Sequence, residues 1–173
     1  MMKRRDMNTQ RIQPERGFSL IEVLVSLGLL AGVMVAVSSL FIFGGKEVKS
    51  GKEMTEAYSL AHDMQEEMDR MTYTQAWQYF MPTAINPAVD TTYSVLTTTT
   101  SGHSTDALAT LAGYQANING KLYQGVGTLE VEALDATGTA VALNGGIAIR
   151  VTVRVEWWEG TNQRYLHVRS VRF

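Results

Sequence analysis

The chain has 173 residues. Once an apolar segment and a basic leader are set aside, about 130 residues remain, enough for one ordinary globular domain. There is no cysteine, which excludes disulfides and thiolate metal sites. Residues 1–17 carry five basic and two acidic residues, a net charge of +3, whereas the remainder carries ten basic and fifteen acidic residues, a net charge of −5. An acidic main body gives no electrostatic support for a nucleic-acid partner.

A long apolar run covers residues 18–43, and Glu22 is its only charged residue. As a helix, these 26 residues would extend roughly 39 Å, more than the roughly 30 Å hydrocarbon core of a bilayer. The basic residues before the run predict that the N-terminus stays in the cytoplasm and that the chain after Phe43 lies outside. A carboxylate at the centre of a membrane segment costs about 2.5–3.5 kcal/mol, and less near an end, so Glu22 needs a partner.

Three interpretations of this N-terminal region compete. A cleaved secretory signal could end at Ser38, but the run is longer than the apolar region of such signals, about 7–15 residues. An uncleaved membrane anchor accounts neither for Glu22 nor for the Gly17-Phe18 pair at the boundary between polar and apolar sequence. The third interpretation places a cleavage between Gly17 and Phe18, which would give Phe18 a cationic amine one helical turn before Glu22.

The stretch from Gly17 to Leu24 reads GFSLIEVL and resembles the processing signal of type IV prepilins and of the pseudopilins of type II secretion. The resemblance is close over residues 1–45. It implies that a membrane-embedded prepilin peptidase cuts after Gly17 and methylates the new amine of Phe18. It also implies that Glu22 serves subunit assembly, because the corresponding acid in this family faces the terminal amine of a neighbouring subunit.

Beyond the apolar run, the sequence predicts a second, amphipathic half of the same helix. Apolar residues recur at spacings of three and four, which places them on one helical face. They are Met54, Ala57, Ala61, Met64, Met68 and Met71. The glycine pair at 44–45 favours a bend between the halves. His62 and Glu66 have a spacing that could hold a metal, but a solvated helix face gives the same spacing, and we predict no metal site and no cofactor.

The second half of the chain predicts a polar connection followed by an antiparallel sheet. The connection is rich in Thr, Ser, Ala, Asn and Gly and contains one strand near residues 92–100. The clearest strand follows Gly146, because Ile147, Ile149, Val151, Val153, Val155 and Trp157 alternate with polar residues. A turn at residues 159–162 then predicts a C-terminal hairpin, an ending similar to that of V-type minor pilins.

The hairpin is rich in arginine and could bind DNA together with its aromatic residues. Its arginines are Arg150, Arg154, Arg164, Arg169 and Arg172. We favour a solvated outer sheet face over a DNA site. No set of catalytic residues can be assembled from the sequence, and we therefore predict no enzymatic activity.

Together these features predict an α+β, pilin-like fold in which a long N-terminal helix packs on a C-terminal antiparallel sheet. The expected parts are a cleaved leader (1–17), an apolar transmembrane and assembly helix (18–45), its amphipathic continuation (46–80), a variable loop region (81–120) and the sheet (121–173). The expected function is that of a minor type IV pilin that starts as a single-pass inner-membrane protein and then enters a pilus. A minor pseudopilin of type II secretion is the second interpretation. A membrane-anchored enzyme or binding module is the third.

Overall fold

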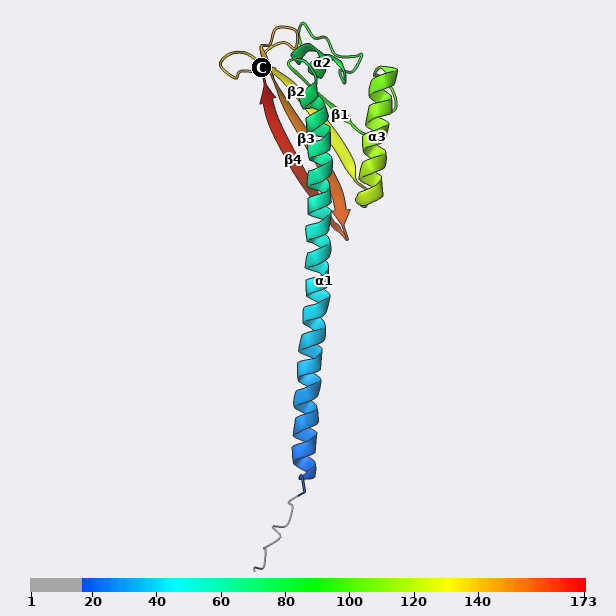
Figure 1. Ribbon diagram of the computed structural model, residues 1–173, viewed down its shortest axis with the longest axis vertical. Coiled ribbons are helices and arrows are strands. Elements are labelled where there is room, and N and C mark those ends of the chain that lie inside the picture. The colour runs from blue at the N-terminus through cyan, green and yellow to red at the C-terminus, as the bar shows by residue number, and fades with distance from the viewer. Residues whose placement is uncertain (1–16) are drawn as a thin grey trace, which may run out of the picture. The chain divides into compact units, whose positions relative to one another are not determined.

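The computed structural model describes residues 17–173, so residues 1–16 of the predicted leader lie outside the described part of the chain. Its elements are the helices α1 (Leu20–Arg70) and α2 (Tyr73–Gln78), strand β1 (Thr92–Leu96), helix α3 (Thr105–Lys121), and strands β2 (Val126–Leu134), β3 (Ala148–Glu159) and β4 (Asn162–Arg172) (Figure 1). The chain divides into two compact units, Met1–Gly45 and Lys46–Phe173. The predicted α+β, pilin-like fold is confirmed, because α1 is followed by an antiparallel sheet that packs on its second half.

Helix α1 differs from the prediction at its start and at the glycine pair. It begins at Leu20 and not at Phe18, and it continues through Gly44 and Gly45 without interruption. Each glycine weakens a helix interior by about 1 kcal/mol, but unlike proline it keeps its N–H group and clashes with nothing, so the helix persists.

The predicted helix of residues 46–80 is in fact two helices, because α1 ends at Arg70. Helix α2 follows after Thr72, whose side chain accepts a hydrogen bond from the backbone N–H of Gln75, while the Gln75 side chain accepts one from the backbone N–H of Thr72. This reciprocal pair is a capping box, which starts a new helix and fixes its direction.

The sheet is an antiparallel meander in the order β1-β2-β3-β4. In β3, Ile149, Val151, Val153, Val155 and Trp157 are fully or almost fully buried, as the alternation predicts. Ile147, the first residue of the predicted alternation, lies before β3 and is exposed. The hairpin is also confirmed, since Glu159 pairs with Asn162 across a two-residue loop. The first loop residue, Gly160, has φ of 63°, the left-handed conformation that this position of a type II′ turn needs.

Helix α3 corrects the prediction that residues 81–120 are a loop region. Only the segments on either side of β1 are loops, and residues 105–121 are helical. Ser104 caps the helix by accepting a hydrogen bond from the N–H of Ala107, and Ala107, Leu111 and Ile118 are its buried residues. Sequence analysis missed this helix because the segment is rich in Thr, Ala, Asn and Gly, a composition that indicates a loop, and only three of its residues are buried.

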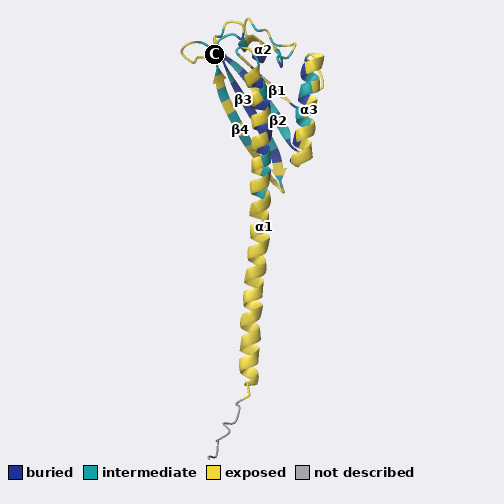
Figure 2. Cartoon of the chain, in the orientation of Figure 1, coloured by how far each residue is buried: buried dark blue, intermediate teal, exposed yellow. Residues whose placement is uncertain are grey.

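The core lies between the sheet and the second half of α1 (Figure 2). Of the residues predicted to form the apolar face of the amphipathic half of α1, Ala57, Ala61, Met64 and Met68 are buried. Met71 is partly buried against the core, whereas Met54 is 43% exposed and is the exception. The methionines therefore serve mainly to pack α1 against the sheet.

Helix α3 is held by a close approach to two glycines beside β2. A Cβ atom at Gly125 would lie 2.4 Å from Ile118 Cγ2, and one at Gly127 would lie 2.7 Å from Thr97 Cγ2 and 2.9 Å from Ile118 Cδ1. Buried Thr97 adds a polar link, since its hydroxyl bonds the Gln115 side chain and accepts from the N–H of Gly127 at 2.9 Å. The missing side chains at these glycines leave the space that Ile118 fills.

The last strand also closes the C-terminal end of α1. The Arg172 guanidinium donates hydrogen bonds to the carbonyl oxygens of Met68, at 2.6 Å, and Met71, at 2.7 Å. Carbonyls at a helix C-terminus have no partner inside the helix and carry partial negative charge, which favours a cation there. Arg172 thus joins the end of the chain to the end of the long helix.

The first prediction concerns the contact between Ile118 and Gly127. Gly127→Ala should lower the free energy of unfolding by about 1–3 kcal/mol, because the added methyl group overpacks a filled space. Gly113→Ala is the matched control, since a Cβ there meets nothing within 4 Å and alanine in a helix interior is favoured by about 0.5–1 kcal/mol. Urea unfolding followed by the fluorescence of the buried Trp77 and Trp157 measures both. Equal stability of the two variants would contradict this account of how α3 is held.

The second prediction concerns Arg172. Arg172→Ala should lower the free energy of unfolding by about 1–3 kcal/mol, because two part-buried carbonyls lose a charged donor. The free energy of unfolding of Arg172→Lys should lie between those of the parent chain and Arg172→Ala. A lysine keeps the positive charge but not the several N–H donors of the guanidinium. Arg169→Ala is the control, as its guanidinium makes only a 3.3 Å hydrogen bond to the Thr152 hydroxyl. Urea unfolding measures these variants too. If Arg172→Ala leaves the free energy of unfolding unchanged, water replaces the hydrogen bonds of Arg172.

Candidate functional site

The candidate site begins with three residues that precede the first helical turn. Residues 17–19 are not helical, and the carbonyl of Ser19 accepts hydrogen bonds from the N–H groups of Glu22, at 2.9 Å, and Val23, at 3.2 Å. Ser19 is therefore the residue at which the helical hydrogen bonds start. Gly17 has no neighbour within 4 Å of a Cβ position, and Phe18 is 81% exposed. Both residues of the predicted cleavage site are accessible.

Glu22 lies in the first turn of α1, where the N-terminal end of the helix favours an anion. Within residues 17–173 its carboxylate has neither a hydrogen bond nor an ion pair. The structure thus brings Gly17, Phe18 and Glu22 to one end of one helix, within about a turn of each other. It supplies no partner for Glu22 from the described chain.

The helix that follows Glu22 has an apolar surface that nothing in the described chain covers. Every large apolar side chain from Phe18 to Phe43 is exposed, by fractions that run from 45% at Val37 to 81% at Phe18. Burying such a side chain is favourable by about 1.5–3 kcal/mol, so a run of them in water would be strongly unfavourable. This segment needs an apolar environment, either a membrane or neighbouring chains.

Three serines interrupt the apolar surface without exposing unpaired hydroxyls to it. Ser26, Ser38 and Ser39 each donate to the carbonyl four residues earlier, at 2.8, 2.8 and 3.0 Å. The hydroxyls are thereby satisfied inside their own helix. By length and composition α1 is able to cross a membrane, and it is the one helix of that kind among the described residues.

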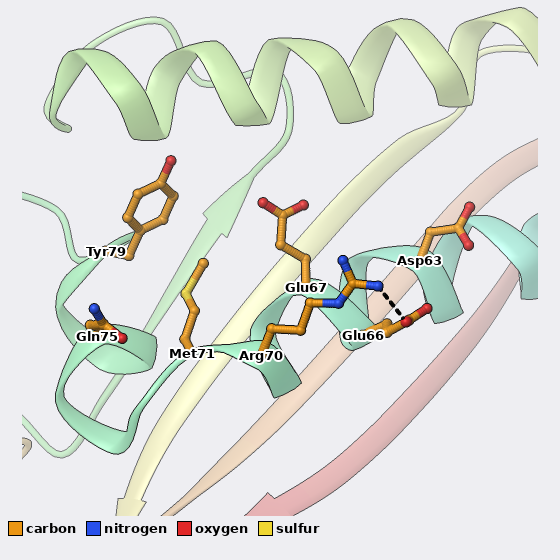
Figure 3. Close-up of a pocket in the computed structure, with 7 residues that line it drawn as sticks. All are labelled: Asp63, Glu66, Glu67, Arg70, Met71, Gln75 and Tyr79. Carbon is orange, nitrogen blue, oxygen red and sulfur yellow. Dashed lines mark hydrogen bonds and ion pairs between the residues drawn. The ribbon is translucent and has the colours of Figure 1, made fainter.

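The second unit offers a groove of about 660 Å³ beside the C-terminal end of α1 and α2 (Figure 3). Glu66 and Arg70 in this groove are joined by an ion pair at 2.7 Å, and Glu67 points away from them. The Tyr114 hydroxyl of α3 donates to Glu67 at 2.5 Å. Burial raises the pKa of Tyr114, and the Glu67 carboxylate raises it further, so the phenol stays protonated at neutral pH. This pair links α1 to α3.

The predicted helical spacing of His62 and Glu66 does not bring a metal site together. The His62 ring stacks on Tyr58, with ring centroids 6.0 Å apart, while Glu66 is engaged by Arg70. No group of three or more metal-ligating side chains occurs within residues 17–173.

The arginines of the C-terminal hairpin are mostly engaged by acids of the same domain. Arg150 pairs with Glu132 at 2.5 Å, Arg154 with Glu156 at 2.8 Å and Arg164 with Glu159 at 2.9 Å. The pairing with Glu132 could not be predicted from the sequence, because it depends on the register of β2 and β3, which places Glu132 opposite Arg150. A surface whose positive charges are largely neutralised is a poor DNA site.

The comparisons with known proteins bear on the N-terminal site alone. The prokaryotic N-terminal methylation motif matches residues 12–38, which include Gly17, Phe18 and Glu22. The chain has no significant match among curated proteins or among solved structures. Residues 12–38 therefore carry the signature of type IV prepilins and pseudopilins, on a chain whose folded part has the pilin-like order of a long helix and an antiparallel sheet.

Proposed function

We propose that this protein is a minor type IV pilin, a structural subunit that takes part in assembling or priming a pilus. The observation that carries the proposal is the methylation motif at the start of an apolar helix whose side chains are all exposed. A subunit of this kind is stored in the inner membrane and moves into a filament. In both places its apolar helix is buried, first by lipid and then by neighbouring subunits.

Processing occurs between Gly17 and Phe18 in this proposal. A prepilin peptidase removes residues 1–17, and the new amine of Phe18 is methylated. Residues 17–19 are exposed and not helical, which supports this because a peptidase needs access to a non-helical bond. The basic leader stays on the cytoplasmic side and the domain of residues 46–173 lies outside.

Glu22 has its partner in another subunit in this proposal. Its carboxylate lies one turn from the new terminus, and no group within residues 17–173 pairs with it. When the helices of several subunits pack together, the amine of a neighbouring Phe18 can neutralise it in a dry interface. A buried ion pair of this kind adds little net stability. It disfavours any alignment of the packed helices that would leave one of the two charges buried without its partner.

A minor pilin is favoured over a major one by two features of the sequence. There is no proline between Pro14 and Pro82, where major pilins commonly have one in the membrane half of the helix, and there is no cysteine pair near the C-terminus. A minor pseudopilin of type II secretion is the second candidate, since the same motif serves both systems. Neighbouring genes for pilus or for secretion-channel components would separate them.

The role we infer is structural and not enzymatic. In the groove of Figure 3, Glu66 and Arg70 form an ion pair, and Glu67 accepts a hydrogen bond from Tyr114 of α3, so these side chains are engaged in structural contacts. The competing hypothesis, a membrane-anchored enzyme or binding module, requires an intact N-terminus. The mature N-terminus therefore decides between the two.

The third prediction is a mature protein that begins at methylated Phe18. Mass spectrometry of the membrane-extracted protein, from cells with an active prepilin peptidase, should find this terminus. Gly17→Val should keep residues 1–17 attached, because a β-branched side chain hinders the approach of the peptidase to the scissile bond. Gly28→Ala, inside the helix and without a neighbour within 4 Å, should be processed normally. A chain that keeps Met1 in such cells would overturn the proposal.

The fourth prediction concerns Glu22. Glu22→Val and the isosteric Glu22→Gln should both be inserted and cleaved, because the scissile bond is a full turn away. Incorporation into sheared surface filaments should fall, since the neighbour's ammonium would be left unpaired at a cost of about 3–5 kcal/mol. Glu47→Gln, which alters an exposed acid outside the apolar run, is the control. Normal incorporation of both Glu22 variants would show that its charge has no assembly role.

A further inference from the structure

The outer edge of β4 has no strand beside it. The strand is 11 residues long and lies at the end of the sheet, and β3 is the one strand that pairs with it within residues 17–173. In Figure 1 it forms one side of the sheet, while α3 lies on the β1 side. An edge strand presents a row of backbone N–H and C=O groups that another chain can pair with, and natural proteins usually shield such edges.

The shielding of β4 is confined to its two ends. Arg164 and Arg172 face the α1 side of the sheet near the two ends, and each is held by a carboxylate or by helix carbonyls. Between them, Leu166 and Val168 pack against the core but are only partly buried. Both side chains keep some exposure in the described chain, and Figure 2 shows β4 as exposed and intermediate along its length. The middle of the edge is therefore apolar on its inner face and open.

Helix α1 provides a second wall next to this edge. Gln65 donates to the Ser170 hydroxyl of β4 at 2.5 Å, which fixes the side of the helix that faces β4. Tyr58 lies seven residues, or two turns, before Gln65 and so on the same side. Tyr58 is 55% exposed, and its ring stacks on His62. An exposed aromatic pair thus flanks the open edge on the face where Leu166 and Val168 lie.

The charge of the edge indicates what kind of strand would fit it. There is no acid in β4, which carries three arginines and His167. On its outer face Arg169 bonds only the Thr152 hydroxyl and has no carboxylate partner within the described residues. Opposite charges across a strand pair stabilise it and like charges destabilise it.

We propose that the edge of β4 and the Tyr58 side of α1 form a docking site for an extended, acidic segment of a different protein. The segment adds to the sheet as a fifth strand. Its backbone pairs with β4, its inward apolar side chains contact Leu166, Val168 and Tyr58, and its outward acids face Arg169 and His167. Backbone bonds supply affinity in this mode of recognition, and alternate side chains supply specificity. The site lies in the unit Lys46–Phe173 and does not depend on cleavage at Gly17.

A second copy of this chain is a poorer occupant of the site. Two β4 strands side by side would both bring three arginines and a histidine, without one acid between them. An antiparallel pair centred on Val168 would set Arg172 against Arg164 and Arg169 against His167. The acidic strand β2, which carries Glu130 and Glu132, is the interior partner of β1 and β3 and is not available.

The test uses the detergent-solubilised full-length chain and a fluorescein-labelled peptide that alternates valine and glutamate. Fluorescence anisotropy should show saturable binding, and amide hydrogen exchange should slow in β4 but not in β1. Tyr58→Ala should weaken binding about tenfold, because it removes the aromatic wall. Arg169→Glu should weaken it similarly and should favour a peptide with lysine in place of glutamate. Tyr123→Ala, at a 65% exposed tyrosine that does not lie beside β4, is the matched control and should bind like the parent chain.

Three results would overturn the proposal. A peptide with alternate N-methylated amides cannot donate to a strand edge, so equal binding of that peptide would exclude strand addition. Unchanged affinity in both the Tyr58 and Arg169 variants would place the binding elsewhere. Concentration-dependent self-association of the chain, with β4 protected before any peptide is added, would show that a second copy occupies the edge. None of these outcomes affects the cleavage test at Gly17, so the two proposals fail separately.

Discussion

The burial of one face of α1 against the sheet is the contact on which the folded domain depends. Ala57, Ala61, Met64 and Met68 belong to the same buried core as the inward side chains of β2 and β3, with two alanines followed by two methionines along this face. The flexible methionine side chains fill the space between the helix and the strands. The same helix has no such cover before Gly45. One element therefore serves two environments, a protein core in its second half and an apolar medium in its first.

This division explains why the two parts of α1 have different amino-acid compositions. In the second half, apolar residues occupy one face because only that face meets the sheet, and charged residues such as Lys49 and Glu53 pair along the others. In the first half, apolar residues occupy all faces, as expected of a helix surrounded by lipid or by other helices. Glu22 is the exception, and its isolation is what gives it a place in our proposal for assembly.

The remaining elements of the domain secure the sheet at its two sides in different ways. On the β1 side, α3 places Ile118 over two glycines, and Tyr114 joins it to Glu67 of α1. On the β4 side, polar contacts to α1 come from Ser170 and Arg172. A helix thus lies on one side of the sheet, while within the described residues the other side ends in a strand with a free edge. This asymmetry is the basis for the inferred docking site.

The sequence by itself determined the N-terminal site, the amphipathic half of α1 and the C-terminal hairpin, because each depends on local patterns: a motif, a 3.6-residue period and a two-residue period. Helix α3 was missed although Ala107, Leu111 and Ile118 recur at helical spacings of four and seven, because only the tertiary structure supplies the hollow over Gly125 and Gly127 that receives Ile118. The neutralisation of Arg150 by Glu132, the closure of α1 by Arg172 and the open edge of β4 were likewise decided by tertiary structure. These contacts join residues far apart in the chain, and strand order and register alone bring them together.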